Sequence, residues 1–193
     1  MKQAVGTIFL LIIQTLNIMA TEKQAYRVAH TEKEFEIRYY PSAILATIHS
    51  QARAYRELAY PGFRQLAGYI FGGNETGAKI AMTSPVHMDI NDSLSSMSFV
   101  MPSSYEMEKL PAPDNTKLTL QKTGDEYVAA LGFGGYATDK RIRQYSEKLR
   151  EMLEERQIPY SGRFRYLGYN PPYQFLGRKN EIIVTVQWPG ELP

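Results

Sequence analysis

The order of predicted elements is the same in both halves of the chain, and this repetition limits the possible folds more than any other feature. Each half is predicted to contain a bent strand, a helix and two further strands. The two predicted helices are offset by roughly 84 residues, which is typical of a duplicated supersecondary unit. We therefore expect an α+β fold in which two βαββ units join their sheets into one curved, largely antiparallel surface with two main helices.

The first half begins with a bent strand, which is followed by a helix and two further strands. Its predicted strands are residues 35–40, 44–48, 80–90 and 97–101. The first two alternate with a period of two and meet at a corner fixed by Pro41. Apolar residues recur at helical spacing from Tyr55 to Ile70. Because proline lacks a backbone N–H, Pro61 predicts that this helix either starts at that residue or kinks there.

The second half repeats the order after a polar break at residues 112–115. Its predicted strands are residues 118–120, 127–133, 164–169 and 181–186. Thr138 predicts the start of the second helix and Pro159 its end. Apolar residues such as Ile142 and Leu149 form one stripe and charged residues cover the rest, so this helix is expected to cover a sheet with one side only.

The composition excludes several classes of function. The formal net charge is only +2 and basic residues are scattered among acidic ones, so no nucleic-acid partner is expected. The chain has no Cys, which excludes disulfides, a thiolate nucleophile and Cys-ligated metals. The histidines, His30, His49 and His87, have no spacing typical of a shared metal, so no metal centre is expected.

Residues 1–20 have the pattern of a secretory signal, with Lys2, an apolar run and a small residue at Ala20. We expect cleavage near Ala20, a single mature domain over residues 21–193 and a periplasmic or secreted monomer. The apolar run is short and interrupted, so no stable membrane span is expected after cleavage. The alternative is a membrane anchor formed by residues 4–20.

Six segments of the mature chain carry a resemblance to a known family. They are residues 35–40, 69–74, 79–86, 133–136, 168–172 and 178–182. Their order and spacing, from about Phe35 to Trp188, strongly resemble the SOUL haem-binding protein family. The resemblance implies a twisted antiparallel β-barrel with two helices, similar to bacterial effector-binding domains of the gyrase-inhibitor type. It also implies non-catalytic binding of haem or a free-base porphyrin, for transport, buffering or sensing.

The resemblance further implies where such a tetrapyrrole binds. A macrocycle needs a flat apolar slot, and its two propionates need cations at the rim. In the family this slot is assigned to the first helix and to the loop between the last two strands. The matching residues are Phe63, Arg64, Ala67, Gly68 and Phe71 in the helix, and Tyr173, Gln174 and Arg178 in the loop.

Two residues are candidates for an axial ligand of the iron. Some relatives have His in the first strand where this chain has Tyr39, and a deprotonated Tyr ligates ferric iron in catalase. The other candidate, His87, follows the corner at residues 82–85. A purely structural role in a strand is the alternative for both. We therefore expect binding that depends mainly on apolar contact, with ligation optional.

Two other functions stay open on the sequence alone. Related effector-binding folds use a pocket Glu and Tyr to hydrolyse small electrophiles, and the candidates here are Glu57, Glu181 and Tyr69. In the third interpretation, the cleft receives a peptide or a partner helix on exposed aromatic residues such as Tyr166, Tyr169 and Tyr173.

Overall fold

The computed structural model describes residues 21–171 and 173–189 of the chain. Its elements, in chain order, are β1 (Glu22–Lys23), β2 (Arg27–Thr31), β3 (Phe35–Tyr40), β4 (Ile44–Ser50), α1 (Tyr55–Ile70), β5 (Thr83–Ser84), β6 (Val86–Asp89), β7 (Ser95–Val100), the 3-10 helix η1 (Met107–Lys109), β8 (Leu118–Lys122), β9 (Glu126–Gly134), α2 (Asp139–Glu155), β10 (Tyr160–Gly168) and β11 (Lys179–Val186). The predicted α+β class with two main helices is confirmed. The predicted signal peptide, residues 1–20, lies outside the described residues. Within these described ranges, no helix is both long enough and apolar enough to cross a membrane.

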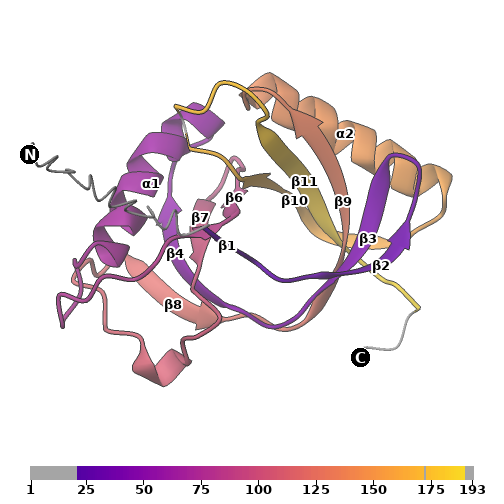
Figure 1. Cartoon of the computed structure of the whole chain (residues 1–193). Coiled ribbons are helices and arrows are strands. Elements are labelled where there is room, and N and C mark those ends of the chain that lie inside the picture. The colour runs from indigo at the N-terminus through magenta and orange to yellow at the C-terminus, as the bar shows by residue number, and fades with distance from the viewer. Residues whose placement is uncertain (1–20, 172, 190–193) are drawn as a thin grey trace, which may run out of the picture.

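Nine strands form one antiparallel sheet in the order β2-β3-β9-β11-β10-β6-β7-β4-β8 (Figure 1). The predicted closure into a barrel is wrong, because in the described part of the chain this order has two ends, at β2 and β8. Each bent strand divides at its corner, so that β3 pairs with β9 while β4 pairs with β8. The sheet therefore curves without closing. All residues of β2 are exposed, and an edge that buries no apolar surface gains nothing by closing on β8.

Both helices contribute to the same hydrophobic core. α1 packs on β4 and β7, and α2 packs on β9, β10 and β11 (Figure 1). Leu66 of α1 and Leu149 of α2 are fully buried in this core. Side chains alternate between the two sides of a strand, so neighbouring positions of the sheet face the other way. They form a second, smaller cluster of Tyr40, Val128, Ala130, Leu167 and Ile183.

Two elements differ from the predicted ones because of prolines. α1 starts at Tyr55 and continues through Pro61. Leu58 and Leu66 are buried on either side of this proline, so core packing outweighs the lost backbone hydrogen bond. The strand predicted at residues 80–90 is shorter, because Pro85 has no N–H for the ladder and separates β5 from β6.

Candidate functional site

The outward side of α1 forms an open groove of about 500 Å³. It is lined by Tyr60, Pro61, Arg64, Gln65 and Gly68. The groove is open at Gly68, because a Cβ at that position would meet nothing within 4 Å. The side chain of Arg64 makes no hydrogen bond or ion pair with any residue that the structure describes. Two of the predicted site residues, Arg64 and Gly68, therefore lie together on an accessible surface.

Phe63 and Ala67 belong to the same helix, and Phe71 follows it directly. Residues spaced by four share a side of a helix, so Phe63 and Ala67 lie on the same side of α1. Phe63 is partly buried, and its ring centroid lies 5.2 Å from that of Phe99 in the core. Phe71, directly after the helix, is 65% exposed. The structure thus places all five of these predicted residues on α1 or directly after it, and only Arg64 and Gly68 line the groove.

The loop between β10 and β11 presents apolar side chains to solvent. Tyr173 and Phe175 are each 76% exposed, and Leu176 is 86% exposed. Gln174, the other predicted residue of this loop, donates a hydrogen bond to the carbonyl oxygen of Leu176 at 3.0 Å. Among the described residues, no hydrogen bond, ion pair or ring contact joins this loop to α1. The two predicted parts of the site are therefore present but are not linked by polar contacts.

Arg178 lies inside this loop and not at a charged rim. Its side chain is buried, and its Nη1 donates to the carbonyl oxygens of Pro171 and Gln174, each at 2.8 Å. The guanidinium also lies 4.6 Å from the centroid of the Tyr136 ring. These contacts stabilise the conformation of the loop. They also engage the guanidinium of Arg178, which the resemblance would assign to a propionate.

Tyr39 joins the corners of the two bent strands. Its hydroxyl donates to Oδ2 of Asp125 at 2.8 Å, and Oδ1 of the same carboxylate accepts the N–H of Ser42 at 2.7 Å. The hydrogen bond to the Asp125 carboxylate raises the pKa of Tyr39. A raised pKa opposes formation of the phenolate that would ligate iron, so the contacts of Tyr39 favour a structural role.

His87 is buried in β6 on the side of the sheet away from the helices. It lies opposite Leu167, a member of the second cluster, and its Nε2 is 2.7 Å from Oε1 of Gln24. Burial lowers the pKa of His87 to about 3, so the ring is neutral at physiological pH. The α1 groove and His87 therefore do not share a side of the sheet. In the described ranges, no group of three or more His, Asp or Glu residues could hold a metal ion.

Glu181 belongs to a buried charge network. Its carboxylate accepts two hydrogen bonds from the Arg38 guanidinium, at 2.9 and 3.0 Å, and one from the Tyr169 hydroxyl at 2.5 Å. Burial alone would raise the pKa of Glu181, but the hydrogen bonds from Arg38 and Tyr169 lower it. A carboxylate acts best as a general base when its pKa is near the working pH, so this network disfavours a catalytic role for Glu181.

The other two candidates for catalysis lie elsewhere. Glu57 is exposed near the start of α1, where it accepts the backbone N–H of Arg53 at 3.0 Å. Tyr69 is buried, and its hydroxyl donates to the carbonyl oxygen of Pro111 at 3.0 Å. No hydrogen bond or ion pair of the described residues links Glu57, Glu181 and Tyr69 to one another.

Sequence reasoning missed three exposed residues of α1 and the β10–β11 loop, namely Tyr60, Phe175 and Leu176. Together with Phe71 and Tyr173 they are the five most exposed large hydrophobic side chains of the described residues, at 65 to 86%. For Phe175 and Leu176 the available signal was a group of apolar residues in the β10–β11 loop that follows neither a helical nor a strand period. Apolar residues that cannot belong to a regular element are candidates for contact with a ligand or a partner.

The fold recurs in solved structures of distant sequence. The C-terminal domain of EcmrR superimposes with a TM-score of 0.57 at 10% identity, over 84% of this chain and 98% of that domain. A hydrolase from Listeria innocua superimposes with a TM-score of 0.54 at 8% identity, over 82% of this chain and 94% of that one. At these identities the likeness shows the fold alone, and it is compatible with the predicted effector-binding fold.

The sequence comparisons identify the family. The model of the SOUL heme-binding protein family matches residues 21–185. "Heme-binding protein 1" of Xenopus laevis is 28% identical over 155 residues, which cover 77% of this chain and 81% of that protein. "Heme-binding protein 2" of Mus musculus is 26% identical over 156 residues, which cover 77% of this chain and 76% of that protein. The chain therefore belongs to the SOUL heme-binding protein family, and the predicted resemblance is confirmed.

Proposed function

We propose that this protein binds haem or a related tetrapyrrole, without catalysis, through the exposed apolar side chains of α1 and of the β10–β11 loop. Membership of the family supports the class of ligand. The observation that carries the location is the concentration of exposed apolar side chains. The five most exposed large hydrophobic side chains of the described residues all lie on α1, directly after it or in this loop. Large exposed apolar surfaces mark ligand or partner sites.

The chemistry of these residues fits a tetrapyrrole. Tyr60, Phe71 and Tyr173 offer flat apolar area to a macrocycle. Arg64, which has no partner among the described residues, offers a guanidinium to a propionate. Arg64 thus takes the role that the resemblance implied for Arg178, because the guanidinium of Arg178 is hydrogen-bonded to carbonyl oxygens inside the loop. When bound, haem would supply an iron centre, while the residues named here bind and orient the macrocycle.

Titration with haemin, followed by the Soret absorbance, tests this proposal. Phe71→Glu and Tyr173→Glu each place a carboxylate on the exposed surface and are expected to weaken haemin binding about tenfold or more. Val28→Glu is the matched control, because Val28 is also exposed, at 49%, but lies on β2. Equal losses in all three variants would contradict the location. Absence of any Soret change in the parent protein would contradict the function.

We also propose that residues 1–20 direct export and are removed, so that the domain acts as a monomer in the periplasm or outside the cell. The arrangement of Lys2, the apolar run and Ala20 supports this proposal. Expression of the full chain in a Gram-negative host, with mass spectrometry of each cell fraction, is the test. The expected species begins at Thr21 in the periplasmic fraction. A full-length chain in the membrane fraction would support an anchor formed by residues 4–20 instead.

A further inference from the structure

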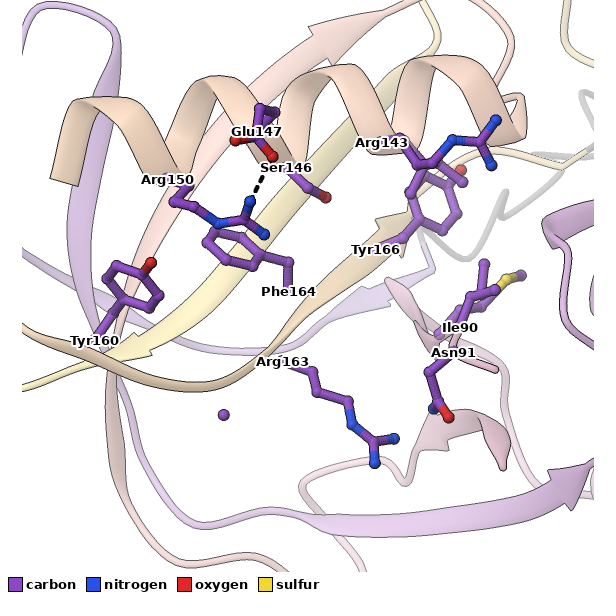
Figure 2. Close-up of a pocket in the computed structure, with 13 residues that line it drawn as sticks. Ile90, Asn91, Arg143, Ser146, Glu147, Arg150, Tyr160, Arg163, Phe164 and Tyr166 are labelled. Carbon is purple, nitrogen blue, oxygen red and sulfur yellow. Dashed lines mark hydrogen bonds and ion pairs between the residues drawn. The ribbon is translucent and has the colours of Figure 1, made fainter. Parts of the chain in front are cut away.

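A pocket of about 580 Å³ lies between α2 and the beginning of β10 (Figure 2). Apolar side chains line its floor, including Met88, Ile90, Phe164 and Tyr166, and Ile142 of α2 adds an apolar wall. The volume is in the range of small-molecule sites. The pocket shares no lining residue with the groove on α1, so it is a separate feature of the molecule.

The backbone of β10 opens this pocket. The register of β10 against β11 shifts between Ser161 and Arg165, and β10 pairs with β6 only from Tyr166 onward. Gly162 lies in the irregular stretch with φ +76°, and a Cβ at this position would meet nothing within 4 Å. A bulge bends a strand locally, and such bulges are frequent next to binding sites. The cavity is therefore a consequence of the chain path and not of one small side chain.

Three arginines surround the apolar floor, namely Arg143, Arg150 and Arg163 (Figure 2). Arg150 forms an ion pair with Glu147 at 2.5 Å, and Arg163 reaches Asp89 at 3.5 Å. Arg143 makes no hydrogen bond or ion pair with any residue in the described part of the chain. The pocket therefore has an excess of positive charge, and Arg143 is its uncompensated cation.

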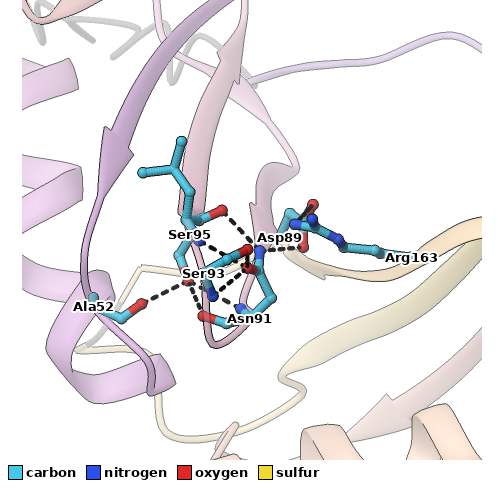
Figure 3. A network of polar contacts seen from close by, with 7 residues as sticks. Ala52, Asp89, Asn91, Ser93, Ser95 and Arg163 are labelled. Atoms are coloured by element: carbon cyan, nitrogen blue, oxygen red, sulfur yellow. Dashed lines mark hydrogen bonds and ion pairs between the residues drawn. The ribbon is translucent and has the colours of Figure 1, made fainter.

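Another wall of the pocket is a turn held by its own hydrogen bonds (Figure 3). Oδ1 of Asn91 accepts the backbone N–H groups of Ser93 and Leu94, each at 2.9 Å. The hydroxyl of Ser95 donates to the carbonyl oxygen of Ala52 at 2.7 Å, which ties the turn to the segment before α1. This wall is formed before any ligand arrives, so little conformational freedom is lost on binding.

We propose that the pocket binds an organic anion with a flat aromatic body and a carboxylate. The aromatic body packs on Phe164 and Ile142, which are only partly buried, and the carboxylate pairs with Arg143. Aromatic rings favour offset or edge contacts with other rings. A guanidinium presents two parallel N–H groups that match a carboxylate, which makes arginine the residue best suited to this recognition. A neutral ligand would cover the apolar floor of the pocket but would leave the positive charge of Arg143 uncompensated.

Fluorescence titration with 1-pyrenebutyrate tests the proposal, with 1-pyrenebutanol as its neutral analogue. The acid is expected to bind saturably and the alcohol about tenfold more weakly, since only the acid can pair with Arg143. Arg143→Glu is expected to weaken binding of the acid by about tenfold. Lys140→Glu removes the same charge from α2 outside the pocket and is the matched control. Equal binding of acid and alcohol, or equal losses in the two variants, would overturn the proposal.

A second pair of variants tests the cavity itself. Ser146 lines the pocket from α2, so Ser146→Trp is expected to fill it and abolish saturable binding. Gln144→Trp places the same side chain on α2 outside this pocket and should leave binding unchanged. Circular dichroism shows whether both variants fold. If Ser146→Trp does not fold, the Arg143→Glu and Lys140→Glu pair still decides the outcome.

Haemin titrations of the same variants separate this site from the surface beside α1. Unchanged haemin affinity in Ser146→Trp, with a loss in Phe71→Glu, supports two independent sites. Loss of haemin binding in Ser146→Trp, with no change in Phe71→Glu, would support an anion site beside α2. It would also overturn the location proposed for the tetrapyrrole.

Discussion

α1 and α2 have equivalent places in the two halves of the chain, yet their outward surfaces differ in chemistry. Beside α1 the surface is an open apolar groove with one arginine that has no partner among the described residues, and the β10–β11 loop adds exposed apolar side chains to the proposed site. Beside α2 the apolar area is recessed and surrounded by arginines. The inward sides of both helices carry the same kind of buried leucine. The fold therefore fixes the inward side of each helix and leaves the outward side free for binding.

Substitutions on the inward sides of the two helices should lower the stability of the protein by similar amounts. These are the largest effects that we expect. Leu66 in α1 and Leu149 in α2 are both 0% exposed. Replacement of either by Ala is expected to lower the free energy of unfolding by about 2–5 kcal/mol, through lost apolar burial and the cavity left behind. Urea unfolding measures both, with Lys140→Ala on the exposed side of α2 as the control. A loss below about 1 kcal/mol for one leucine would show that the two helices are not equivalent.

The side of the sheet away from both helices should respond to pH through His87. Burial lowers its pKa to about 3 in the folded protein, compared with 6.5 in the unfolded chain. The unfolded state therefore takes up a proton first as the pH falls. The stability contributed by neutral His87 is complete above pH 6.5 and is lost progressively as the pH falls toward 3. Between pH 7.5 and 5 the expected loss is about 2 kcal/mol.

Urea unfolding of His87→Gln at the same pH values checks this prediction. The variant should lose this part of the pH dependence, whereas His49→Gln, at an exposed position, should keep it. Haemin binding per folded molecule should be the same in His87→Gln and in the parent protein, because His87 does not face the α1 groove. A Soret change that depends on His87 would mean that haem enters the other side of the sheet.

The sequence predicted the fold better than the site, for physical reasons. Strand and helix periods follow from local side-chain patterns, so β3 and α2 were found close to their observed limits. Arg178 was predicted at a charged rim because its charge is visible in the sequence. Its burial among loop carbonyls depends on the loop conformation, which has no periodic signal. The helix residues of the site were implied by the family resemblance, and they fall on α1 or directly after it.

The pocket beside α2 was not predicted at all. Its opening depends on where β10 leaves its neighbours, and that register is a property of the whole sheet. Gly162 was the single local sign, since isolated glycines in strands often mark bulges. Closure of the sheet into a barrel was implied by the resemblance and was wrong, because pairing of the edge strands is decided by residues far from each strand in sequence.

Gly68 distinguishes the α1 surface from the pocket beside α2, whose helix contains no glycine. A Cβ at Gly68 would meet nothing within 4 Å, so Gly68→Ala is free of steric cost. It is expected to raise the free energy of unfolding by about 0.5–1 kcal/mol, because glycine is a poor helix former. It should also weaken haemin binding, because the methyl group enters the groove.

Gly73→Ala is the contrasting variant, since its Cβ would lie 2.8 Å from the Gly68 carbonyl oxygen and should destabilise the protein. A neutral or destabilising Gly68→Ala would show that this position is not open.

The smallest expected difference concerns the iron. Haemin and iron-free protoporphyrin IX should bind the α1 surface with affinities within about twofold, or about 0.4 kcal/mol. Neither predicted axial ligand supports iron there, because Tyr39 is bound to Asp125 and His87 lies on the other side of the sheet. Parallel titrations followed by quenching of intrinsic fluorescence measure the affinity of both ligands.

A strong preference for haemin would contradict binding by apolar contact and would leave the exposed residues Tyr60 and Tyr173 as candidate ligands. Loss of that preference in Tyr60→Phe or Tyr173→Phe would then identify the ligating residue. It would also show that the α1 surface selects its ligand by coordination, whereas the pocket beside α2 selects by charge.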